Sequence, residues 1–172
     1  MDMPSGLKTT SSPIAVSFSL QESAANTFTQ GRVDLQLNPL DQEVFVVTAV
    51  NLDPAVPDGI AGTNTSIFAS LCTTSQTAVQ NLSTNACLAT AVIDIRAQGF
   101  VDAGVGFTRS SQDTPDTNLE YIGVIATNDF FVQINGTNNA AGKILTGRLF
   151  GYRAKASASI YAALVQSEVL SS

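Results

Sequence analysis

The chain has 172 residues, a formal net charge of −6, 44% apolar residues and only 13% charged residues. This length suits one domain of common size, and no linker divides it into two smaller ones. The negative net charge excludes non-specific binding of nucleic-acid phosphates, because that affinity comes from many Lys and Arg side chains. We therefore expect no specific binding of nucleic acid.

Residues 1–12 are polar and without periodicity, so we predict a flexible N-terminal arm followed by a single domain over 13–172. Residues 1–13 hold one Lys and no apolar stretch, which indicates no secretory signal. No run of eighteen or more apolar residues occurs, so we expect no transmembrane segment.

Alternation of apolar and polar residues predicts the first strands, and β-branched or aromatic runs predict the others. The predicted strands cover residues 14–20, 32–37, 43–52, 66–72, 90–96, 119–126, 130–135 and 145–154. Loops are expected over 53–64, 73–86 and 107–118, and a turn over 135–139. Thr127-Asn128-Asp129 is a tight polar connection, so its flanking strands should form a hairpin. Residues 157–170 carry apolar side chains at helical spacing behind a Ser cap, which predicts a terminal helix.

About eight short strands with turns between them favour an all-β fold, a two-sheet antiparallel β-sandwich. Crossover helices of the kind that join parallel strands are absent from the pattern. An eight-stranded single jelly roll with a short C-terminal helix is the favoured architecture. An immunoglobulin-like sandwich is the alternative, although this sequence lacks the Trp expected of that class.

The sequence contains no histidine. This removes the Ser-His-Asp and Cys-His triads, the usual general base at neutral pH and nearly every zinc site. Two carboxylate pairs remain as catalytic candidates, Asp53 with Asp58 and Asp113 with Asp116. Both pairs stand in proline-containing turns, where Asp commonly bonds nearby backbone amides, and a Ca²⁺ site at the first pair lacks oxygen ligands. We expect no enzyme, no catalytic residue, no metal and no cofactor.

Cys72 and Cys87 bracket the polar loop over 73–86. A disulfide across its base and two buried thiols are both compatible with the sequence. Four of the eight basic residues fall in one stretch, where they form an inward-facing stripe, an interface patch or solvated strand ends: Lys143, Arg148, Arg153 and Lys155. The phenylalanines on strands, among them Phe18, Phe68 and Phe130, are expected in the core.

Three stretches resemble the small capsid-type proteins of tailless icosahedral viruses and of marine viral sequences. They are FSLQESAANTFTQGRVDLQL from Phe18 to Leu37, EVFVVTAVNLDP from Glu43, and GRLFGYRAKASASIYAALVQSEVL from Gly147. The resemblance implies a single jelly-roll coat subunit that works in a virion. One feature departs from many viral coats, because the N-terminal arm carries only Lys8 and is not strongly basic. The inner face of such a shell would then meet a membrane or another protein.

Three functions are compatible with this pattern. The first is a structural virion protein, a capsid subunit that self-assembles as pentamers, hexamers or closed shells in the host cytoplasm. The second is a trimeric decoration or fibre-associated domain on a viral lattice, and the third is a carbohydrate-binding sandwich. The low share of charged residues is compatible with a surface that contacts other copies. It is equally compatible with a weakly charged extracellular surface rich in Ser and Thr. We expect interfaces at 53–64, at the loop between the cysteines and at the two termini, with other virion proteins as further partners.

Overall fold

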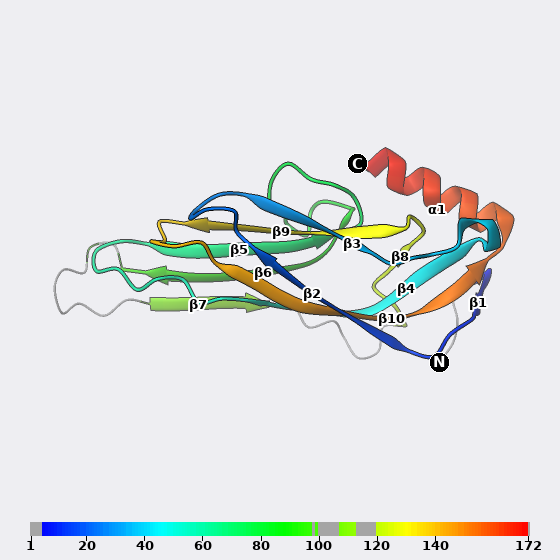
Figure 1. Ribbon diagram of the computed structural model, residues 1–172, viewed down its shortest axis with the longest axis horizontal. Coiled ribbons are helices and arrows are strands. Elements are labelled where there is room, and N and C mark those ends of the chain that lie inside the picture. The colour runs from blue at the N-terminus through cyan, green and yellow to red at the C-terminus, as the bar shows by residue number, and fades with distance from the viewer. Residues whose placement is uncertain (1–4, 98, 100–106, 113–119, 172) are drawn as a thin grey trace.

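The computed structural model describes residues 5–97, 99, 107–112 and 120–171, which form two antiparallel sheets packed face to face (Figure 1). One sheet, called sheet A, contains β1 (Leu7–Thr9), β2 (Ile14–Gln21), β4 (Glu43–Pro54), β8 (Gly123–Ile125) and β10 (Ile144–Ala156). Sheet B contains β3 (Thr29–Asp34), β5 (Thr65–Cys72), β6 (Cys87–Arg96), β7 (Phe107–Gln112) and β9 (Asp129–Thr137). The short 3₁₀ helix η1 (Pro39–Asp41) precedes β4, and the helix α1 (Ala158–Ser171) follows β10.

The strand order is that of a jelly roll. In sheet A, β2, β10, β4 and β8 lie side by side, and in sheet B the order is β3, β9, β5 and β6. The antiparallel partners are nested along the chain, with β2 on β10, β3 on β9, β4 on β8 and β5 on β6. A double-sheet fold with this nesting is an eight-stranded jelly roll, so the predicted fold class is confirmed.

Two further strands extend this framework, and the sequence did not predict them. Residues 7–9, expected within a flexible arm, form β1 and pair with Ala154–Ala156 of β10. Phe107 was expected to open a loop, but it begins β7, which pairs with β6 at the edge of sheet B. Backbone pairing along an exposed edge does not require an apolar alternation, so neither segment carries a strand pattern in its sequence.

The hairpin predicted at Thr127-Asn128-Asp129 is wrong. The connection leaves β8 in sheet A and enters β9 in sheet B, so its two strands belong to different layers. Asn128 fixes the crossing, because its backbone carbonyl accepts a hydrogen bond from Leu35 N at 2.8 Å and its Oδ1 accepts one from Leu37 N at 2.6 Å. A short polar connection suits either arrangement, and these distant contacts select the crossing.

The main core lies between the sheets. Phe45, Leu71, Ile134 and Leu149 are among its fully buried members, and Phe18 meets Phe130 edge to face with ring centroids 5.8 Å apart. The double-sided burial predicted for β4 is confirmed, because its inner residues face this core and its outer residues face a second cluster under α1.

One glycine allows the close approach of β10 to β4 at an irregularity in their register. A Cβ on Gly151 would lie 2.1 Å from the backbone oxygen of Val46, so no larger residue fits there without moving the strand.

The C-terminal helix predicted over 157–170 is confirmed as α1. Ser157 precedes it and accepts a hydrogen bond from Ile160 N through its Oγ at 3.4 Å. Tyr161, Leu164 and Val165 pack on the outer face of sheet A, against a cluster that includes Val44 and Tyr152. Figure 1 shows α1 beyond β8 and β4, at the end of the molecule away from the turns that join β9 to β10. Among the described residues, no helix combines the length and the apolar character that a membrane crossing requires.

Candidate functional site

One end of the sandwich joins three loops around a buried carboxylate. The loops follow β2, β4 and β9, and we call them together the loop end. Glu22 is 3% exposed and accepts hydrogen bonds from the backbone N–H groups of Thr27, Gly136 and Lys143 at 3.1, 3.0 and 2.9 Å. Three donors compensate the burial of this charge and connect the loop after β2 to the turn after β9.

An ion pair adds the loop after β4 to this framework. Asp58 Oδ1 lies 2.6 Å from Lys143 Nζ, and Asp58 Oδ2 accepts a hydrogen bond from Ala140 N at 2.7 Å. The hydrogen bond from Lys143, followed by that from Ala140, holds the pKa of Asp58 below its usual value of 3.8. The Lys143 side chain is 16% exposed and that of Asp58 is 30% exposed, so water weakens this pair only in part.

A buried asparagine completes the connection. Asn139 is 5% exposed, and its Oδ1 accepts a hydrogen bond from Asp58 N at 2.9 Å while its Nδ2 donates to Ser66 O at 3.0 Å. Its backbone N–H and C=O bind the side chain of Asn26. The turn predicted over 135–139 begins later than expected, because residues 135–137 pair with β5 as the end of β9. The left-handed residue of the connection is Asn138, with a φ of 60°. The loop end is therefore cross-braced by side chains from all three loops.

Apolar side chains point outward from this braced end. Val56 is 65% exposed, Ile144 41% and Ile60 37%. Ile144 O accepts a hydrogen bond from Ala55 N at 2.9 Å, which places Ile144 beside the start of the loop that carries Val56 and Ile60. We call these three residues the loop-end apolar residues. Their exposure costs solvation free energy that burial against a partner would recover.

The opposite end carries α1, which a second buried carboxylate attaches. Glu168 is 7% exposed and accepts hydrogen bonds from Ala126 N at 2.7 Å and Thr127 N at 3.0 Å. A cavity of about 260 Å³ lies between the helix and the neighbouring loops, lined in part by Leu37, Tyr161 and Val165. The apolar contact of α1 with sheet A is thus incomplete.

Only one of the two candidate carboxylate pairs lies among the described residues. Asp58 is engaged with Lys143, whereas Asp53 lies in β4 opposite Thr146 of β10. Asp113 and Asp116 lie outside the described residues. Within the described part of the chain, no group of three His, Cys, Asp or Glu side chains is placed to hold a metal ion.

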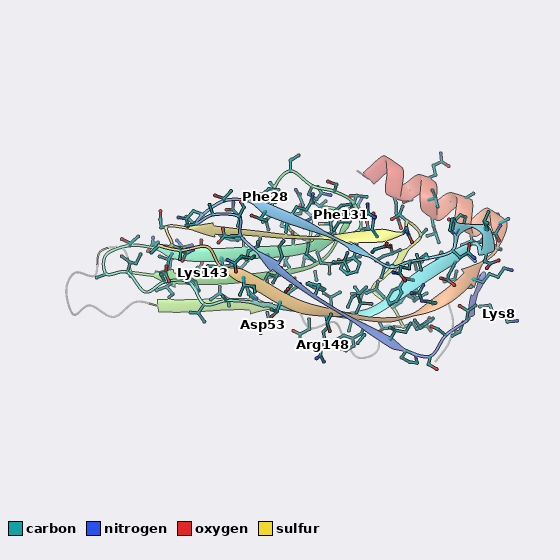
Figure 2. All side chains as sticks on the ribbon, viewed as in Figure 1. Lys8, Phe28, Asp53, Phe131, Lys143 and Arg148 are labelled. Carbon is teal, nitrogen blue, oxygen red and sulfur yellow. The ribbon has the colours of Figure 1, made fainter. Side chains whose placement is uncertain are left out.

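The four basic residues at and just before β10 have different surroundings. Lys143 pairs with Asp58, and Arg153 pairs with Glu43 at 2.8 Å and donates to Leu35 O at 2.8 Å. Figure 2 shows Arg148 and Asp53 near the lower edge of the sandwich, whereas Lys143 lies nearer the loop end. Two of the four charges are therefore balanced within the molecule, which does not favour a continuous basic stripe.

The two cysteines lie directly opposite each other where β5 and β6 meet the loop over 73–86. Both are buried, and the two sulfurs are not bonded to each other in this structure. A hydrogen bond between the thiols, together with burial, raises the pKa of Cys72. Cys72 is therefore a protonated thiol at neutral pH, and a poor nucleophile in this state.

A hollow on the outer face of sheet B was not predicted. Phe68, expected in the core, is 37% exposed and forms part of the lining of this hollow of about 460 Å³. In the sheet register, Phe68 lies between Asn135 and Val92. The remaining lining comes from small, neutral side chains of β5, β6 and β9 and from residues 78–81. The strand pattern places Phe68 on one face of a strand. It does not indicate that this is the outer face of sheet B, where the loop over 73–86 leaves Phe68 partly exposed.

No protein-family model and no curated protein matches the chain. Among solved structures, a chain of desmodium yellow mottle tymovirus is similar to it at 15% sequence identity and a TM-score of 0.34. The similarity covers 92% of this chain and 97% of that chain. A TM-score this low does not establish a shared fold, so the strand order and the contacts described above carry the assignment of the fold.

Proposed function

We propose that the chain is a self-assembling coat subunit of an icosahedral virus, with a structural and not an enzymatic role. The observation that carries this proposal is the loop end, where Val56 and Ile60 on the loop after β4 and Ile144 at the start of β10 are exposed. Glu22 and Asn139 brace this end from behind. Braced loops lose little conformational entropy when they bind, so burying their apolar side chains contributes more of its free energy to association. The small number of charges on the chain also limits repulsion between copies.

The expected partner is another copy of the same chain. A contact that joins different patches of two copies closes into a ring when its rotation allows, and rings such as pentamers and hexamers can build a closed shell. The acidic net charge supports a shell that does not rely on specific binding of nucleic acid. The subunit would assemble in the host cytoplasm and reside in the virion.

Sedimentation velocity of the purified full chain at rising concentration tests this function. We expect the wild type to sediment as pentamers, hexamers or closed shells, and the double variant Val56→Asp/Ile60→Asp to sediment as a monomer with an unchanged circular dichroism spectrum. Two charges placed in a buried contact without partners oppose association strongly.

Leu40→Asp/Tyr121→Asp is the matched control, because both side chains are exposed, at 92% and 39%, outside the loop end and the other expected interfaces. This control should assemble like the wild type. A wild type that stays monomeric at high concentration contradicts the proposed function, and equal assembly of both double variants contradicts the assigned surface.

The hollow on sheet B favours a second candidate function, carbohydrate binding. An aromatic side chain flanked by amides and hydroxyls suits a sugar, whose C–H face packs on the ring while its hydroxyls bond the polar groups. Phe68 supplies the ring, Asn135 and Gln80 the amides, and Thr90 and Thr137 the hydroxyls. A glycan array with wild type and Phe68→Ala tests this function, which requires binding by the wild type that the variant loses.

A further inference from the structure

An irregularity in the register of β5 and β6 brings the two cysteines face to face. Leu71 pairs with Ala89, but the next residue, Cys72, pairs with Cys87, so Leu88 is an extra residue on β6. In a regular ladder Cys72 would stand opposite Leu88, and the Cys87 side chain would point to the other face of sheet B. The bulge therefore places both thiols on the same face, at the base of the loop over 73–86.

The backbone geometry at this position suits a covalent bond between the sulfurs. Directly opposite residues of antiparallel strands have Cα atoms about 4.5–5.5 Å apart, within the range of about 4.4–6.8 Å that disulfides span. Cys87 Sγ donates a hydrogen bond to Ala89 O at 3.4 Å, and Cys72 stands directly opposite Cys87. Joining the sulfurs therefore requires rotation of side chains and no separation of the strands.

The loop that these cysteines close is otherwise attached by neutral polar contacts. One backbone hydrogen bond, from Thr73 N to Ala86 O at 2.9 Å, lies just beyond the cysteine pair. Further along, Gln76 N donates to Gln30 Oε1 at 2.7 Å and Gln80 N donates to Ser70 Oγ at 3.2 Å. Contacts of this kind contribute little individually, so the loop would open more readily than the sheet beneath it.

We propose that Cys72 and Cys87 are a site of reversible oxidative modification, where an intramolecular disulfide fixes the base of the loop over 73–86 to sheet B. A small-molecule disulfide of the glutathione class is the oxidant. Cys87 reacts first, because it is 8% exposed whereas Cys72 is fully buried. Its thiolate attacks one sulfur of the oxidant and releases the first reduced thiol. Cys72 loses its proton and attacks the mixed disulfide, which releases the second thiol. Two electrons and two protons pass from the protein to the oxidant.

Oxidation of the purified full chain with oxidised glutathione tests this proposal. We expect the intact mass to fall by two hydrogen atoms and peptide mapping to find Cys72 joined to Cys87. The melting temperature should rise by about 5–10 °C, because the bond restricts the unfolded chain. Dithiothreitol should reverse both changes. Chymotrypsin cleavage beside the exposed Leu82 should give two fragments that stay together until the disulfide is reduced.

The variants Cys72→Ser and Cys87→Ser provide the matched controls. Each should retain the melting temperature of the reduced wild type within a few degrees and should not respond to the oxidant with an intramolecular bond. Glutathione adducts or disulfide-linked dimers as the end product in the wild type, or two thiols that remain open to alkylation after unfolding in urea, would overturn the proposal. The result does not depend on shell formation, so it stands apart from the test of the coat role.

Discussion

Both ends of the sandwich hold a buried carboxylate on backbone amides, yet the two ends are built differently. Glu22 accepts hydrogen bonds from three N–H groups, two in loops and one in β9, and an ion pair and a buried asparagine brace the same loops. Glu168 accepts hydrogen bonds from two neighbouring N–H groups and attaches one helix beside a cavity of about 260 Å³. We therefore expect the loop end to unfold together with the sheets, and α1 to detach while the sheets stay folded.

The largest expected effect is that of Glu22→Gln, which keeps the shape of the side chain. The amide offers only one acceptor oxygen, so at least one of the three buried N–H groups loses its partner. We expect the free energy of unfolding to fall by about 2–4 kcal/mol, measured by urea denaturation. A loss no greater than that of the helix variant described next would remove the distinction between the two ends.

The matched variant Glu168→Gln should cost about 1–2 kcal/mol, because only one of two N–H groups loses its acceptor. Hydrogen exchange should accelerate in residues 158–168, with little change in β4 or β9. Exchange that accelerates equally in the sheets would show that α1 and the sandwich unfold together.

The smallest expected effect concerns Asp58 and depends on pH. Because its folded pKa lies below the usual 3.8, the pair with Lys143 stabilises the loop end fully above that value. This contribution declines as the pH falls through the lowered folded pKa, when Asp58 becomes protonated. The stability difference between wild type and Asp58→Asn should therefore be constant at neutral pH and shrink in acid. A difference that grows below pH 3.8 would contradict the assigned ion pair.

The sequence predicted the parts of the fold whose pattern is local. Large apolar residues alternate with small ones in β2, and the apolar run from Glu43 forms β4. The three-residue β8 is shorter than the strand predicted over 119–126, because only Gly123–Ile125 pair with β4. Where a strand begins and ends is decided by its position in the sheet and not by residue type alone.

The loop end could not be predicted, because its partners are far apart along the chain. Glu22 and Lys143 are separated by 121 positions, and a glutamate that follows a strand usually faces solvent. Asn139 looked like a turn residue, and its burial depends on loops that precede it by many positions. Cys87 stands at one side of a predicted loop, but its place opposite Cys72 depends on a bulge that no residue pattern marks.

Electron microscopy of the purified full chain tests the central claim most directly. The coat role predicts closed shells or rings in which the loops over 55–64 and 138–143 lie at the contacts between subunits. Images that show only monomers at high concentration would contradict self-assembly. Small oligomers without rings or shells would indicate a domain that decorates an existing lattice.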